Sequence, residues 1–190
     1  MKNIAVFVSG SGSNAENLFR FFEGSQIARV TVLFANKPDI YALTRAKNLG
    51  LESVVFDRSD FRDSDRVLNE LKKRDIDYIV LAGFLWLMPD SITREYAGRI
   101  LNIHPALLPK YGGKGMYGGH VHKAVIEAGE QESGITIHQV NEKYDSGDVV
   151  FQAKVMVTPE DTPDSLAAKI HELEYEFFPQ IVEQEIRKLD

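Results

Sequence analysis

An amide and an imidazole stand two residues apart at the end of an apolar run, as Asn102 and His104 in the segment LNIHPALLP. Residues i and i+2 of a strand project from the same face, so both side chains should point to one side of a sheet. An asparagine amide can donate to an oxyanion, and a histidine exchanges a proton near neutral pH. A histidine at a strand end is more often an ordinary hydrogen-bonded residue. The pair nevertheless has the groups that acyl transfer requires. Other motifs in the chain are needed to distinguish a catalytic pair from ordinary polar residues.

A carboxylate that could serve the histidine lies in the turn YDSGD, between two later β-rich segments. We expect Asp145 to polarise His104 or to manage the proton that an attacking amine loses. An aspartate in a turn is usually an Asx-turn residue, and Asp148 is a competing carboxylate. The sequence separation is no obstacle, because strand ends converge at the carboxyl edge of a parallel sheet. His138, in an alternating segment, is a supporting candidate.

The first apolar run, residues 4–8, ends in the glycine-rich turn GSGSNA, which precedes a helical pattern. Glycines there let the backbone approach a phosphate, and a helix N-terminus supplies free N–H donors. We therefore expect Gly12, Ser13 and Asn14 to bind a phosphate, although Asn14 could instead be the helix N-cap. A dinucleotide would want Asp or Glu at the end of the second strand, where this chain has ANK. A phosphate monoester is favoured over NAD.

Strand and helix patterns alternate over the first hundred residues. Apolar runs predict strands at 4–8, 30–34, 53–56, 78–82 and 100–103. Helical patterns follow the first run through Phe22 and occupy 41–49 and 64–73, and Pro89 could open a further helix. This alternation predicts a parallel, doubly wound, Rossmann-like α/β sheet.

The second half of the chain has a different pattern. A loop rich in glycine and lysine at 108–119 leads to a predicted helix at 120–128, and β-rich segments at 134–140 and 149–157 predict an antiparallel extension of the sheet. Thr162 and Pro163 should open a closing helix, which Pro179 should kink or break. No repeat or linker is visible, so residues 1–190 are expected to form a single domain.

Composition excludes several classes of protein. The 190 residues include no cysteine, so a disulfide, a thiolate nucleophile and a cysteine metal site are ruled out. The net charge is −6 and the basic residues are scattered, which weighs against a nucleic-acid partner. We expect no metal, because His120 and His122 have no carboxylate to complete a ligand set. No segment has the length of a signal peptide or membrane span, so we expect a cytoplasmic protein with no membrane partner.

Four motifs together resemble those of the phosphoribosylglycinamide formyltransferases. They are VFVSGSGSN at 6–14, LAGF at 81–84, NIHPALLP at 102–109 and DSG at 145–147, in the order found in that family. The third motif is specific for folate-dependent formyltransferases in general, and the first narrows the resemblance to the enzymes that act on glycinamide ribonucleotide. The similarity extends over nearly the whole chain.

The resemblance implies transfer of a formyl group from 10-formyltetrahydrofolate to the amine of glycinamide ribonucleotide, a step of purine synthesis, in the formyltransferase fold. It divides the domain into a nucleotide-binding half, 1–100, and a catalytic and folate-binding half, 101–190. By position, the catalytic residues are Asn102, His104 and Asp145. The phosphate-binding residues are Gly12, Ser13 and Asn14, and Glu174 contacts the ribose. The folate-binding residues are Leu85, Trp86, Leu87, Met88, Asn141, Glu142, Lys143, Tyr144 and Asp145.

This sequence departs from the family pattern at three places. Ser64 stands where the family often has an arginine that helps to hold substrate, which leaves Arg62 or Arg66 as candidates for that contact. The loop at 111–119 has an apparent insertion, KGMY, so its motion can differ. Trp86 replaces smaller or basic residues in the wall of the folate pocket. The oligomeric state, the kinetic order and the affinities do not follow from the sequence.

Other functions are weighed against this one. A formyltransferase acting on methionyl-tRNA normally has a further C-terminal domain, and a formyltetrahydrofolate hydrolase has an extra N-terminal domain. We expect neither, because the first strand starts near residue 4 and the chain ends at Asp190 without a basic face. A non-catalytic nucleotide-binding module would not need Asn102, His104 and Asp145 together, and the residues ANK at 35–37 speak against an NAD-dependent dehydrogenase.

Overall fold

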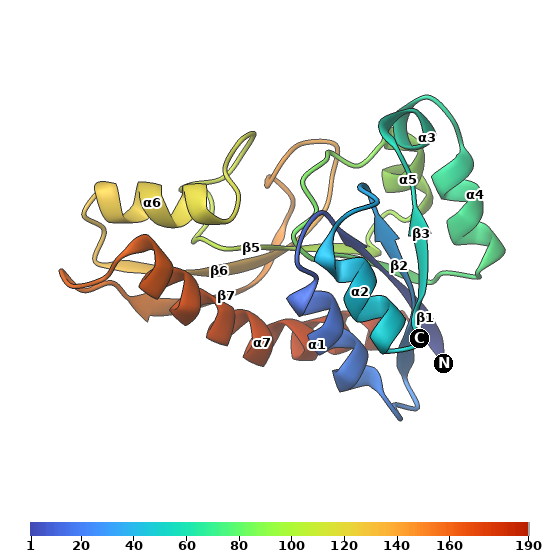
Figure 1. Cartoon of the computed structure of the whole chain (residues 1–190), viewed down its shortest axis with the longest axis horizontal. Helices are drawn as coiled ribbons and strands as arrows, with labels where there is room; N and C mark the ends of the chain where they lie inside the picture. Colours follow the sequence, from blue (N-terminus) through green and yellow to red (C-terminus); the bar gives the residue numbers. More distant parts are fainter. Residues whose placement is uncertain (190) are drawn as a thin grey trace.

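A seven-stranded sheet with the strand order β3-β2-β1-β4-β5-β6-β7 forms the centre of the computed structural model, which describes residues 1–189 (Figure 1). The strands are β1 (Lys2–Val8), β2 (Ala28–Ala35), β3 (Glu52–Val55), β4 (Tyr78–Leu81), β5 (Ile100–His104), β6 (Glu132–Gln139) and β7 (Val149–Met156). The first five are parallel, whereas β6 and β7 are antiparallel to their neighbours. The predicted doubly wound sheet with an antiparallel extension is confirmed.

Seven helices cover the sheet in the described part of the chain. They are α1 (Ser13–Phe22), α2 (Tyr41–Asn48), α3 (Arg58–Arg62), α4 (Arg66–Lys73), α5 (Asp90–Glu95), α6 (Gly119–Glu127) and α7 (Pro163–Arg187). Helices α1, α2, α6 and α7 contribute to one buried cluster, and α3, α4 and α5 to a second cluster on the other face (Figure 1). Two covered faces explain why the central strands are apolar throughout.

Strand β1 shows how the sequence separates the two cores. Ile4, Val6 and Val8 are fully buried in the cluster that includes α1 and α7, whereas Ala5 and Phe7 are fully buried in the other. The alternation follows from the period of two in a strand. This alternation fixes the orientation of β1 and therefore the position of the glycine turn that follows it.

The region after β3 contains a short helix that the sequence patterns did not predict. Asp57 caps α3, since its side chain accepts from the Asp60 amide at 2.8 Å while Asp60 bonds back to the Asp57 amide. A single amphipathic helix was expected at 64–73, and α4 occupies its last eight residues. A five-residue helix has too few apolar residues to show a period, so only its capping box could have revealed it.

Helix α7 begins at the predicted cap, and at Pro179, where a kink or a break was predicted, the helix is not broken. Thr162 and Ser165 form a reciprocal capping box, and the helix continues through Pro179 to Arg187. A proline has no N–H to offer the carbonyl four residues earlier, that of Tyr175. The side chain of Asn17 on α1 donates to this carbonyl at 2.9 Å instead. A contact between helices thus replaces the missing bond.

No helix within residues 1–189 combines the length and the apolar character that a membrane crossing requires.

Candidate active site

Strand β5 presents Asn102 and His104 on the same face of the sheet, as their spacing predicts. Both residues line one cleft of about 790 Å³, whereas the preceding Leu101 is fully buried in the cluster that includes α1 and α7. The cleft lies over the carboxyl ends of β1, β4 and β5, the edge at which parallel sheets bind ligands. The geometric part of the prediction for this pair is confirmed.

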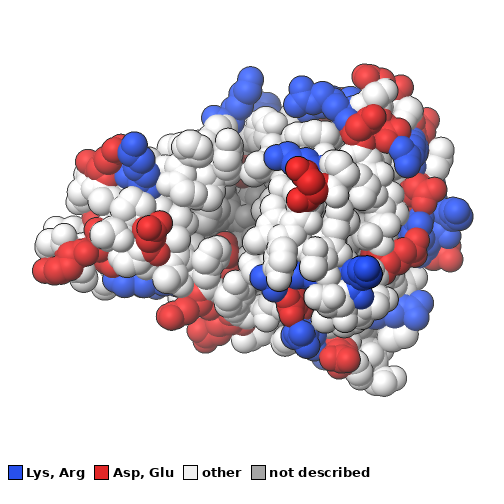
Figure 2. Space-filling view, in the orientation of Figure 1, with Lys and Arg blue, Asp and Glu red and all other residues white. Residues whose placement is uncertain are grey.

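The cleft separates the two ends of the molecule, and mainly uncharged residues surround its opening on the face in Figure 2. Its lining comes from loops and helix ends far apart in the sequence. These segments are Ser9–Asn14 after β1, Ala82–Trp86 after β4, Asn102–Pro105 at the end of β5, Gly113–Gly119 before α6, Tyr144–Asp145 in the turn between β6 and β7, and positions 163–174 on one face of α7.

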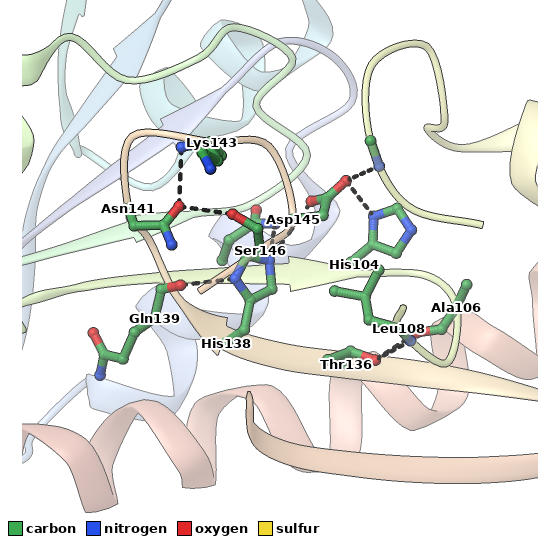
Figure 3. A network of polar contacts seen from close by, with 12 residues as sticks. His104, Ala106, Leu108, Thr136, His138, Gln139, Asn141, Lys143, Asp145 and Ser146 are labelled. Atoms are coloured by element: carbon green, nitrogen blue, oxygen red, sulfur yellow. Dashed lines mark hydrogen bonds and ion pairs between the residues drawn. The ribbon is translucent and has the colours of Figure 1, made fainter. Parts of the chain in front are cut away.

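His104 has an acceptor facing each of its ring nitrogens, and Figure 3 shows the one that Asp145 provides. Nε2 lies 2.7 Å from the carbonyl oxygen of Tyr111, and Nδ1 lies 3.6 Å from Oδ2 of Asp145. Because a carbonyl only accepts, Nε2 carries a proton. Burial lowers the pKa of His104 below its ordinary value, and the Asp145 charge and the Tyr111 carbonyl oppose that effect. A protonated imidazole at this position therefore depends on Asp145.

Asp145 lies at the centre of the polar network in Figure 3. Oδ2 accepts from the Gly113 amide at 2.9 Å, and Oδ1 lies 3.6 Å from Nε2 of His138. Burial alone would raise the pKa of Asp145, but His138, His104 and the Gly113 amide lower it below its ordinary value. The competing Asp148 is exposed and stands outside the cleft lining found in residues 1–189. Geometry thus favours Asp145 as the carboxylate beside His104.

His138 orients the amide of Asn102. The register of β5 and β6 pairs the two residues, and Nδ2 of Asn102 lies 3.0 Å from Nε2 of His138. Nδ1 of His138 lies 2.8 Å from the carbonyl of Gln139 and therefore carries a proton. In the neutral ring Nε2 accepts from the Asn102 amide, whereas a second proton on Nε2 faces Oδ1 of Asp145 and lowers the pKa of that carboxyl. The second N–H of the Asn102 amide can donate to a ligand in the cleft. His138 thus supports the site through Asn102, as expected of a supporting candidate.

The glycine turn takes up the conformation needed at the start of α1. Gly12 is the N-cap residue, with φ +74°, and a Cβ on it would lie 2.5 Å from the Cβ of Ala42. The alternative interpretation of Asn14 as the N-cap is wrong, because Asn14 is inside the helix. Its Nδ2 donates to Oε2 of Glu174 on α7 at 2.9 Å. Gly12, Ser13, Asn14 and Glu174 all line the cleft.

The two segments predicted to bind folate meet at the other end of the cleft. The Leu87 amide donates to the hydroxyl of Tyr144 at 3.1 Å, and Leu85, Trp86 and Tyr144 line the cleft. Met88 is buried in the core instead. Asn141 stabilises its own turn by accepting from the Lys143 amide and the Ser146 hydroxyl. Within residues 1–189, five residues that were predicted to bind folate do not line the cleft: Leu87, Met88, Asn141, Glu142 and Lys143.

An arginine that sequence analysis did not consider lines the cleft. Arg58, in the unpredicted helix α3, lies 5.4 Å over the ring of Trp86. Neither Arg62 nor Arg66 belongs to the lining within residues 1–189, and Arg66 pairs with Asp60. Two further residues without a predicted substrate role, His122 and His171, also line it. Only the recognition of α3 could have drawn attention to Arg58.

No cluster of three or more His, Cys, Asp or Glu side chains suited to a metal ion occurs within residues 1–189.

Comparison with known proteins agrees with this geometry. The chain belongs to the formyl transferase family, whose model matches residues 2–182. Its relatives narrow the class to the phosphoribosylglycinamide formyltransferases. It is 39% identical over 187 residues to the enzyme of that name from Haemophilus influenzae, a match that covers 96% of this chain and 86% of the relative.

Two more proteins extend the comparison. The chloroplastic phosphoribosylglycinamide formyltransferase of Arabidopsis thaliana is 41% identical over 187 residues, which cover 95% of this chain and 64% of that protein. The crystal structure of the phosphoribosylglycinamide formyltransferase from Bacillus halodurans matches with a TM-score of 0.89 and 32% identity, over 100% of this chain and 97% of the other. The resemblance drawn from the sequence motifs is confirmed.

Proposed function

We propose that this protein transfers a formyl group from 10-formyltetrahydrofolate to the amine of glycinamide ribonucleotide, as a phosphoribosylglycinamide formyltransferase of purine biosynthesis. The comparisons confirm that class of enzyme. The observation that supports the reaction is that one cleft contains Asn102, His104 and Asp145 between a glycine turn and an apolar wall. The end of the cleft at the glycine turn suits the ribonucleotide phosphate, and the end at the apolar wall suits the folate ring.

The reaction requires no covalent bond to the protein. The substrate amine attacks the formyl carbon, which gives a tetrahedral intermediate with a negative oxygen and a protonated amine. The free N–H of the Asn102 amide and a protonated His104 would stabilise that oxygen. The amine proton moves, by way of His104 and Asp145, to the folate nitrogen as the carbon–nitrogen bond breaks. The products are the formamide and a folate with an N–H.

The phosphate end rests on the backbone of the glycine turn. Gly12 places the first N–H groups of α1 at the cleft, where they have no partners within the helix. Ser13 and Asn14 add side-chain donors. The hydrogen bond from Asn14 holds the Glu174 carboxylate where it can accept from ribose hydroxyls. This arrangement suits a ribose 5-phosphate.

The folate end has exposed apolar and aromatic side chains that suit a pterin. Leu85 and Tyr144 are each 37% exposed although they are large, and both face the cleft beside Trp86. Exposed apolar side chains that gather in a concave site indicate a ligand of matching chemistry. Folate acts here as the formyl donor, and the proposal includes no metal.

Several narrower expectations stay predictions. These are the division of a single domain into a nucleotide half at 1–100 and a catalytic half at 101–190, the cytoplasmic location, and the absence of nucleic-acid and membrane partners. A dehydrogenase is disfavoured, because Asn36 follows β2 where an acid would hold the ribose of NAD.

The direct test is absorbance-monitored formyl transfer from a 10-formyl folate to glycinamide ribonucleotide. We expect turnover that requires both substrates and yields the formylated ribonucleotide in equal amount with the deformylated folate. Formate release without ribonucleotide would indicate a hydrolase instead. Transfer to methionyl-tRNA but not to the ribonucleotide would also contradict the proposal.

A further inference from the structure

The loop that follows β5 provides one partner of His104 from an unfavourable backbone conformation. Tyr111 has φ +56°, in the left-handed region that residues with a Cβ rarely adopt. Its carbonyl oxygen lies 2.7 Å from Nε2 of His104, which is 4% exposed. Such a conformation persists only where the surrounding contacts hold it. The contacts that hold Tyr111 therefore decide where this acceptor stands.

Packing alone does not enclose Tyr111. A second cavity, of about 200 Å³ and separate from the cleft, lies beside this residue. Its lining comes from the loop after β5, the end of α6 and the strands β6 and β7, and it includes Leu107, Val125, Glu130 and Gln152. A side chain beside an open space makes fewer van der Waals contacts than one in a filled core. A polar contact is then needed to fix the phenol.

Glu130 makes that polar contact. Its Oε1 accepts from the Tyr111 hydroxyl at 2.9 Å and from Nζ of Lys110 at 2.8 Å. The bonds from Lys110 and Tyr111 lower the pKa of Glu130, so this carboxylate is charged at neutral pH. Burial and the bond to Glu130 raise the pKa of Tyr111, which therefore keeps its proton. A hydrogen bond to an ionised acceptor is stronger than one between neutral groups.

The end of helix α6 fixes Glu130 in turn. Gly129 has φ +66°, and its amide donates to the Ile126 carbonyl at 3.0 Å. The Glu130 amide donates to the Val125 carbonyl at 3.3 Å. These two bonds form the Schellman motif, a common helix ending that fixes the residues after the last turn. A helix end, a carboxylate and a phenol are thus connected in series to the carbonyl that faces His104.

We propose that Glu130 is a positioning residue for His104. It fixes the phenol of Tyr111, which keeps the Tyr111 carbonyl on Nε2 before substrates bind. The inference rests on the proposed function, because it concerns the imidazole that acts in that reaction. Glu130 lies outside the cleft lining found in residues 1–189, so its effect reaches the site through Tyr111.

This arrangement makes the protonation of His104 depend on Glu130. Burial lowers the pKa of His104, and the Tyr111 carbonyl opposes that effect. Loss of the bond to Tyr111 should therefore lower this pKa further and reduce the fraction of imidazolium at alkaline pH. Substitution at position 130 leaves the other titratable groups around the ring unchanged. They are Asp145 in the turn between β6 and β7, His138 on β6, Glu174 on α7 and His122 on α6.

NMR titration of His104 in Glu130→Ala, Tyr111→Phe and the wild type provides the test. The His104 signal is assigned as the one missing from His104→Ala. Both substitutions remove the bond between phenol and carboxylate, so each should lower the pKa of His104 in the free enzyme. Glu130→Gln keeps an acceptor oxygen and should retain most of the wild-type value. The matched control is Glu132→Ala, because Glu132 lines the same cavity but pairs with Lys154 at 2.7 Å.

Initial rates with both substrates well below KM give a second readout, since they report the free enzyme. On the alkaline side of the profile, the rate of Glu130→Ala should fall by about threefold to tenfold, the size expected for one lost hydrogen bond. On the acid side it should match the wild type. Rates at saturation should change less, because the formyl donor then replaces the Tyr111 carbonyl at Nε2. Combining Tyr111→Phe with Glu130→Ala should cost no more than either change alone.

Two outcomes would overturn the inference. One is an unmoved His104 pKa in both Glu130→Ala and Tyr111→Phe. The other is an equal loss of activity at every pH, which would reduce Glu130 to a structural role. Absence of formyl transfer by the wild type would instead contradict the proposed function, and the NMR titration would still decide whether Glu130 acts on His104.

Discussion

His104 is hydrogen bonded through Nε2 to the carbonyl oxygen of Tyr111 at 2.7 Å, and Tyr111 presents that carbonyl from a left-handed backbone conformation with φ +56°. The phenol of Tyr111 donates to Glu130 at 2.9 Å, and Glu130 also pairs with Lys110. The imidazole is thus held between Tyr111 and Asp145. To meet a formyl oxygen through Nε2, it must give up the bond to Tyr111.

The first prediction concerns the proposed oxyanion contacts. Asn102→Ala and His104→Ala should each lower kcat by about 100- to 1,000-fold, because each removes a donor to charge that develops in the transition state. KM for both substrates should change little, since these donors act mainly during reaction. Steady-state kinetics with each substrate varied in turn provides the measurement. A rise in KM with unchanged kcat would assign the pair to ground-state binding.

A second prediction separates the two carboxylates of the turn. Burial already lowers the pKa of His104, and the Asp145 charge raises it. Asp145→Asn removes that raising effect, so the pKa of His104 falls further and less imidazolium is present at neutral pH. Activity should fall at pH 7 and recover partly in acid. The measurement is kcat against pH together with NMR titration of His104.

Asp148→Asn is the matched control, because Asp148 is exposed in the same turn. It should leave the pH profile of activity near that of the wild type. Near-normal turnover in Asp145→Asn, or a loss confined to Asp148→Asn, would show that the wrong carboxylate had been assigned.

The third prediction tests the phosphate end. Gly12 is a poor place for a substitution, since any Cβ would meet Ala42. Ser13→Asp instead puts a carboxylate beside the phosphate and should raise the ribonucleotide dissociation constant by about tenfold or more, because like charges repel. Folate binding should be unaffected. Ser91→Asp, at an exposed position in the first turn of α5, is the control. A selective loss of folate affinity would reverse the assignment of the two ends.

A fourth prediction addresses the folate end. Trp86→Ala should raise KM for the formyl donor by about tenfold to 100-fold, the size of effect found when an aromatic partner of a stacked base is removed. Trp86 also packs against Phe56 and Phe61, so Trp86→Phe is needed as a variant that keeps an aromatic ring. It should recover most of the affinity. Unchanged donor KM in Trp86→Ala, measured with saturating ribonucleotide, would remove Trp86 from the proposed folate site.

The fifth prediction concerns stability. Asn17→Ala should lower the free energy of unfolding by about 0.5–1.5 kcal/mol, because the Tyr175 carbonyl loses its partner. In a Pro179→Ala background the same change should cost less, since Ala at 179 restores an N–H to that carbonyl. Urea unfolding of the four proteins gives the coupling energy. Additive effects would mean that Asn17 does not compensate for the proline.

The sequence predicted those parts of the site that depend on local geometry. Asn102 and His104 share a face because side chains alternate along every strand. The turn before α1 was predictable because its glycines stand between an apolar run and a helical pattern. The choice of Asp145 over Asp148, in contrast, needed the family resemblance, since a turn aspartate has no pattern of its own. Its proximity to His104 is set by the packing of β6 and β7 beside β5.

What could not be predicted depends on contacts between distant segments. Pro179 normally ends a helix, and only the position of Asn17 on α1 explains its tolerance in α7. Asn14 matched a cap by residue type, but packing places Glu174 within its reach. The left-handed backbone of Tyr111 is a property of the folded loop, because no residue type at that position indicates it.

The hydrogen bond between Asn14 and Glu174 joins residues separated by 160 positions in the chain. During synthesis on the ribosome, the glycine turn is made well before its partner on α7. A nascent chain that still lacks α7 can pair its first strands, but its nucleotide site is incomplete. Affinity for the ribonucleotide should arise only when α7 leaves the exit tunnel and docks against α1, so ligand binding reports the docking of α7.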